Sequence, residues 1–261
     1  MVRHLAQVLL AALMLLASGR GARRPVPPPP LPAVVHIDTS GARDALALLQ
    51  ALNQGQTLDQ QAARSLLVTK PYQVLLAYHR RLDSGVTLDS LAEMLLAVQD
   101  EKVLATHGPR LGRMHATWRW ARGEIPMLQA RLQQLSDPAV LERAVARARA
   151  ALPPHVRLEA TVYVLAAGYS PSDTTENAVV LDVLQIARVD RLEAWLAHEL
   201  HRIGVYTITP KPCADPDVGP ALDTLAGLIQ EGATTYWVDG WRARAVADDY
   251  EQVQDFIEQI L

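Results

Sequence analysis

Cysteine is nearly absent from this 261-residue sequence, which holds a single one, Cys213. A lone thiol has no partner within the chain, so a scaffold stapled by disulfides is excluded. Aromatic residues are also few, at 5% of the chain, whereas hydrophobic residues make up 49%. This composition and this length are typical of a globular protein that buries a full hydrophobic core.

Acidic residues are missing from the first 32 positions, which hold four of the 25 Lys and Arg residues. Residues 33–261 therefore carry 21 basic residues against 28 acidic ones, a formal charge of −7. Binding to nucleic acids depends on basic side chains that neutralise phosphates. The acidic balance of the main part of the chain argues against a nucleic-acid partner.

The apolar run at the N-terminus, residues 5–17, is too short for an ordinary membrane-spanning helix, which needs about 20 apolar residues. Basic residues precede it and small residues follow it, which is the layout of a secretory signal peptide. Three arginines just after the run oppose translocation, so an uncleaved anchor is the alternative. We predict a signal peptide or N-terminal anchor over residues 1–22, and hence an exported protein, periplasmic or extracellular, that touches a membrane only through this segment.

Six prolines between positions 25 and 32 follow this segment. Such a run forms a stiff, extended spacer that cannot contribute to a core. We therefore predict a proline-rich linker over residues 23–32 and one folded domain over residues 33–261.

The domain begins with a long region in which apolar residues recur at helical spacing. This periodicity predicts helices over residues 45–52, 58–67, 74–82, 88–98, 104–135 and 139–152. Residues 156–167 and 178–186 are instead rich in Val, Leu and Ile, and a cluster of turn-forming residues separates them, so we expect two neighbouring strands. The expected fold is α+β, predominantly α-helical, with a small β-sheet packed against the helix that follows it.

That following helix is predicted over residues 191–203, with Gly204 placed to end it. At 100° per residue, Glu199 falls within the apolar face of this helix, His198 on its flank and His201 almost opposite. A buried carboxylate is costly unless a positive group meets it, which makes Glu199 the most informative residue of the sequence. The same geometry predicts that His201 is exposed.

His198 and Glu199 form the first half of the HExxH pattern, in which two histidines of one helix bind zinc and the Glu activates a metal-bound water. The pattern here is HELHR, with Arg202 in place of the second histidine. Further along, the segment EGATTYW contains Glu231, 33 residues after His198, on another predicted helix. A Glu from a second helix is a zinc ligand in one large group of peptidases.

The strand pair, the HELHR helix and EGATTYW together resemble a family of bacterial zinc-dependent peptidases of gluzincin type. The resemblance extends from about residue 156 to residue 239, and it implies a metallopeptidase-like domain with a zinc cofactor. It implies His198 and Glu231 as zinc ligands and Glu199 as the catalytic base. Tyr236 is a candidate donor to the transition state, and the implied partner is a peptide or protein substrate.

Two consequences of Arg202 stay open, because a guanidinium cannot coordinate a metal. In the first, Arg202 pairs with Glu199 or Glu231 and leaves a catalytically inactive pseudo-peptidase that binds peptides or a partner protein. In the second, His201 replaces the missing ligand and peptide-bond hydrolysis survives. A third hypothesis, a helical interaction module in which HELHR is accidental, predicts that Glu199 and Glu231 lie far apart.

Overall fold

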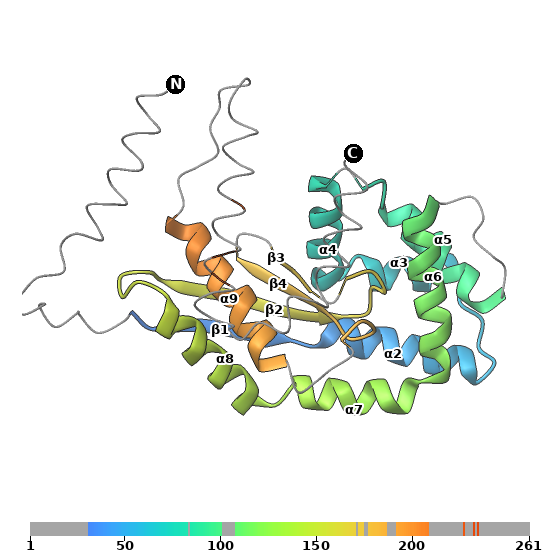
Figure 1. Cartoon of the computed structure of the whole chain (residues 1–261). Coiled ribbons are helices and arrows are strands. Elements are labelled where there is room, and N and C mark those ends of the chain that lie inside the picture. The colour runs from blue at the N-terminus through green and yellow to red at the C-terminus, as the bar shows by residue number, and fades with distance from the viewer. Residues whose placement is uncertain are drawn as a thin grey trace, which may run out of the picture.

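The computed structural model describes residues 31–82, 84–100, 108–170, 172–174, 177–186 and 192–208, together with residues 227, 232 and 234. Within these ranges one strand is followed by seven helices, then by three strands and a last helix (Figure 1). The predicted α+β fold, predominantly α-helical with a small sheet, is confirmed. The described part of the chain contains no helix long and apolar enough to cross a membrane.

The helices follow the predicted periodicity closely. They are α2 (Ser40–Asn53), α3 (Gln60–Leu67), α4 (Lys70–Arg81), α5 (Leu88–Asp100), α6 (Gly108–Gly123), α7 (Ile125–Leu135), α8 (Pro138–Ala151) and α9 (Leu192–Ile208). The single helical run expected over 104–135 is wrong in detail, because α6 and α7 are separated at Glu124. Pro126 explains this break, since proline lacks the backbone N–H that a continuous helix needs and is favoured in a first turn.

Among the described residues the sheet has four strands, in the spatial order β1-β2-β4-β3. They are β1 (Ala33–Asp38), β2 (Leu158–Leu165), β3 (Ser172–Thr174) and β4 (Ala178–Asp182). β2 is parallel to both β1 and β4, and β3 lies antiparallel to β4 at the edge. The predicted pairing of the two central strands is therefore correct. β1 and β3 were not expected, and residues 183–185 form a turn rather than the end of a strand.

Helices cover the sheet on both faces. α9 packs on one face of the sheet, and α8 lies along α9 (Figure 1). This face is identified by Thr174 of β3, which bonds to Glu199 of α9, and by Val179 of β4, which is in register with Thr174. Side chains alternate between faces along a strand. Ala178 precedes Val179 on β4 and is in register with Thr161 of β2, so both of these side chains point to the opposite face. α4 and α2 pack on that face, and Thr161 and Ala178 face α4.

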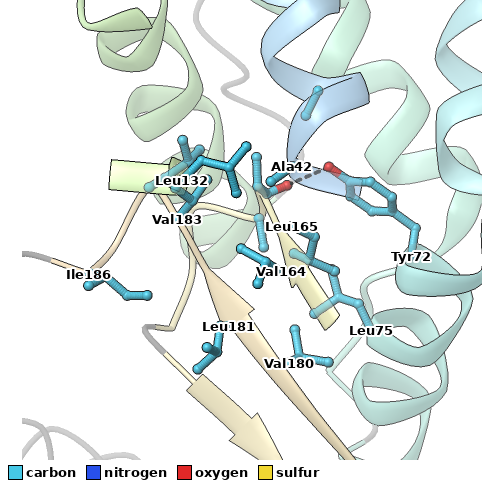
Figure 2. Packing of buried hydrophobic residues seen from close by; sticks show 14 of the residues in the cluster. Ala42, Tyr72, Leu75, Leu132, Val164, Leu165, Val180, Leu181, Val183 and Ile186 are labelled. Atoms are coloured by element: carbon cyan, nitrogen blue, oxygen red, sulfur yellow. Dashed lines mark hydrogen bonds between the residues drawn. The ribbon is translucent and has the colours of Figure 1, made fainter. Parts of the chain in front are cut away.

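The core is continuous between these layers. Leucine and valine side chains of β2 and β4 meet residues of α2, α4 and α7, and Tyr72 donates a hydrogen bond of 2.8 Å to the Ala166 carbonyl oxygen (Figure 2). Trp118 donates a bond of 3.1 Å to the next carbonyl, that of Ala167. Two buried aromatic donors thus fix the segment that follows β2.

Candidate functional site

α9 is the helix that carries the HELHR sequence, and it is buried on its long apolar face. Leu192, Leu196, Leu200 and Ile203 are all at most 1% exposed. The expectation that Gly204 ends this helix is wrong, because α9 continues to Ile208. A Cβ at position 204 would overlap the side chain of Leu152, so glycine serves here to let α9 approach the end of α8.

Glu199 lies within this buried face, as the sequence predicted, with an exposed fraction of 6%. Its Oε2 accepts a hydrogen bond from the hydroxyl of Thr174, on the edge strand β3. The same oxygen lies 3.3 Å from Nη1 of Arg202, one turn further along α9. A hydroxyl donor and a guanidinium therefore offset the desolvation of this carboxylate.

Arg202 lies at the border between the buried face and solvent, with 29% of its side chain exposed. One of its nitrogens contacts Glu199, and the other lies 3.4 Å from the hydroxyl oxygen of Tyr206. The guanidinium is held from two sides along one helix. The structure contains the pairing of Arg202 with Glu199, whereas Glu231, the other partner considered, lies outside the described residues.

His201 is buried, at 3% exposure, so the prediction of an exposed histidine is wrong. Its Nδ1 lies 3.0 Å from the hydroxyl oxygen of Thr234, which is itself fully buried. The helical wheel failed because α9 is covered on a second side by a residue 33 positions further along the chain. His198 is half-buried, consistent with its predicted place on the flank.

Glu231 and Tyr236 lie outside the described residues, and so does most of the segment around them. Thr234, three positions after Glu231 in sequence, is described and contacts α9 through His201. Among the described residues, no three His, Cys, Asp or Glu side chains gather as a metal site would require. Of the predicted site residues, the structure thus brings Glu199 and Arg202 together.

One residue of the edge strand β3, Thr174, is hydrogen-bonded to helices on both sides of the sheet. The hydroxyl of Thr174 bonds to Glu199, while its carbonyl oxygen accepts a hydrogen bond of 3.2 Å from Nη2 of Arg81, at the end of α4. Sequence reasoning missed both Thr174 and Arg81. The signal was weak, because residues 172–174 lie within a stretch of turn-forming residues.

Asp182 was missed as well, although a single acidic residue at the end of the apolar strand β4 was a detectable signal. It is 1% exposed, and its carboxylate accepts four backbone N–H bonds, from residues 167, 168, 169 and 184. Burial raises the pKa of Asp182 to about 6, although these donors oppose the shift. The carboxylate links the chain segment that follows β2 to the segment that follows β4, at the C-terminal ends of these two strands.

His79 is fully buried, and its Nδ1 lies 3.2 Å from the hydroxyl oxygen of Ser84. Its ring packs against that of Tyr169, and the guanidinium carbon of Arg110 lies 4.6 Å from the centre of the Tyr169 ring. Burial, assisted by the charge of Arg110, lowers the pKa of His79 to about 4. His79 is therefore neutral at neutral pH.

The sequence of the chain matches one family model over residues 63–261, that of DUF5700, described as "Putative zinc dependent peptidase". The chain belongs to this family. The resemblance found from HELHR and EGATTYW is thereby confirmed at the level of the DUF5700 family. No curated protein and no solved structure matches the chain.

The described residues of this DUF5700 member do not fit the zinc ion that the family description implies. Arg202 occupies the place of the second histidine, and its permanent charge lies 3.3 Å from the carboxylate of Glu199. A divalent cation beside this guanidinium would meet repulsion instead of a ligand. His201, the other candidate, contacts Thr234 through Nδ1, and among the described residues it is not part of any group of three His, Cys, Asp or Glu side chains.

Proposed function

We propose that this chain is a peptidase-fold protein that binds extended peptides without zinc-dependent hydrolysis. The observation that carries this proposal is the contact between Arg202 and the buried Glu199, at 3.3 Å. In the family pattern, position 202 holds a metal ligand and position 199 holds the base that takes a proton from water. The guanidinium of Arg202 therefore has two effects: it neutralises the charge of the Glu199 carboxylate, and it replaces the second metal ligand of the family pattern.

Peptide binding is supported by the position of β3. This short strand lies at the edge of the described sheet (Figure 1). Thr174, its last residue, donates a hydrogen bond to Glu199. An extended peptide binds such an edge by adding a strand, so that main-chain hydrogen bonds supply affinity for many sequences. The peptide would then run past Arg202 and Tyr206, whose side chains are partly exposed.

A second candidate, an active zinc peptidase, has one observation in its favour. His201 is turned toward Thr234, which follows Glu231 by three residues in sequence, and not toward solvent. In this candidate His198, His201 and Glu231 would hold the zinc, and Glu199 would be the base. For both candidate functions we propose that the protein is exported, through the predicted signal peptide or anchor of residues 1–22.

The zinc content of the full-length protein separates the two candidates. We expect no bound zinc in the wild type after zinc loading and dialysis, and about one zinc per chain in Arg202→His, which restores the two-histidine pattern. His198→Ala combined with Arg202→His is the matched control and should lose the metal again. About one zinc in the wild type, lost in His201→Ala, would overturn the proposal in favour of the active enzyme.

A digest of casein provides the test of peptide binding. We expect the wild type to retain a subset of its peptides during ultrafiltration, while mass spectrometry finds no new peptide termini. New termini that disappear in Glu199→Gln would demonstrate hydrolysis and refute an inactive protein. Absence of any retained peptide would refute the binding function.

A further inference from the structure

A separate cavity opens on the opposite face of the sheet, between α4 and the middle of β2. It has a volume of about 290 Å³, and its floor is formed by Thr161 and Tyr163 of β2 with Ala178 of β4. Lys70 and Gln73 of α4 form one wall, and Asn177 lies at the rim. The sheet separates this cavity from Glu199, since side chains alternate between the two faces.

Tyr163 gives the cavity a built polar group. The residue is 9% exposed, and its hydroxyl has no hydrogen-bond partner among the described residues. Tyr163 borders the cavity, so its free hydroxyl is available to a ligand there.

The other polar groups of the lining are rich in donors and carry one positive charge. The ammonium of Lys70 has no ion-pair partner among the described residues, and Thr161 and Asn177 add a hydroxyl and an amide. Among the described residues no acidic side chain lines the cavity, and the α4 wall also contains the apolar Val74. One ammonium, several neutral donors and an apolar wall are complementary to a singly charged anion with a short hydrocarbon part.

We propose that this cavity, here named the α4 cavity, binds a small monocarboxylate, with its carboxylate between Lys70 and Tyr163 and its hydrocarbon part along Val74. The carboxylate accepts from the ammonium and from the free tyrosine hydroxyl. A volume of about 290 Å³ lies at the lower end for small-molecule sites, which suits a ligand of a few carbon atoms.

Titration of the full-length protein with sodium butyrate, followed by saturation-transfer NMR and calorimetry, tests the proposal. We expect saturable binding that weakens about tenfold in Lys70→Gln and about fivefold in Tyr163→Phe, which removes only the hydroxyl. Arg119→Gln, at an exposed cation of α6 far from the cavity lining, is the matched control and should bind as the wild type does. Circular dichroism confirms that each variant is folded.

The alternatives to a monocarboxylate are outcomes of the same titration. 1-Butanol, which has the same hydrocarbon part without the charge, should bind at least about tenfold more weakly than butyrate. Equal binding of butanol would show a merely apolar cavity, and tighter binding of inorganic phosphate would show a different anion class. Either result, or butyrate binding that is unchanged in both variants, would overturn the proposal, and none of them depends on zinc or on peptide binding at α9.

Discussion

Asp182 permits a quantitative test of the structure, because its carboxylate joins the chain segments that follow β2 and β4. One carboxylate oxygen accepts from the backbone N–H of Ala167 and Leu184, and the other from that of Gly168 and Tyr169. Asp182→Asn keeps the shape but puts an amide donor in place of one oxygen, so that two N–H groups face a donor. Each buried donor without an acceptor costs about 1–3 kcal/mol, and we expect a loss of about 3 kcal/mol near pH 7.5 once the relief of a buried charge is included.

The pH dependence of this difference follows from the pKa of Asp182. Burial raises that pKa from 3.8 to about 6 in the folded protein. Between these two values the folded state binds more protons than the unfolded state, so this carboxyl stabilises the fold as the pH falls and loses that contribution as the pH rises through about 6. Going from about pH 7.5 to about pH 5.0 should add about 1.4 kcal/mol to the wild type and nothing, through this group, to Asp182→Asn.

Urea unfolding followed by circular dichroism at both pH values provides the measurement, with the free energy of unfolding extrapolated to water. The variant serves as the reference, because every other titrating group is common to the two proteins. The difference in stability should widen from about 3 to about 4.4 kcal/mol on acidification. A difference that narrows would mean that the four N–H bonds outweigh burial and depress the pKa, which would refute the reasoning.

The remaining predictions concern close contacts and buried donors, and urea unfolding checks each of them. Gly204→Ala should destabilise the protein by about 1–3 kcal/mol, because the added methyl group overlaps Leu152, whereas Gly112→Ala, with no atom within 4 Å of the added group, should be neutral or stabilising by up to about 1 kcal/mol. Gly168→Ala should cost about 2–3 kcal/mol, since this residue has a φ of +81° and its Cβ would lie 3.1 Å from a backbone oxygen; an unchanged stability would contradict that backbone conformation. Tyr72→Phe should cost about 1–3 kcal/mol, because it leaves the carbonyl after β2 without its donor, and a neutral result would show that water replaces the hydroxyl.

The helices and the central strands could be predicted from the sequence, because periodicity is a local signal. β1 could not, since it is half-exposed and short, and its partner β2 lies far along the chain. β3 was hidden for a related reason: three residues within a turn-rich segment become a strand only through pairing with β4. The missed strands are those whose identity depends on a distant partner.

The candidate site was predictable to the same extent. The buried position of Glu199 follows from the helical wheel, and the identity of Arg202 made a pairing between them foreseeable. The burial of His201 was not, because it depends on Thr234, a contact across 33 residues. Thr174 became visible as a donor to Glu199 only once β3 was known.

The pairing of β1 with β2 also sets conditions on how the chain folds. Ala33 is in register with Leu158, so their pairing closes a loop of about 125 residues that contains seven helices. Pairing over such a sequence separation is slow unless the intervening chain has already become compact. We expect the helices to form first during synthesis. β1 then stays without its partner strand until β2 has left the ribosome. A chaperone that shields residues 33–38 during this interval would raise the yield of folded protein without changing its final stability.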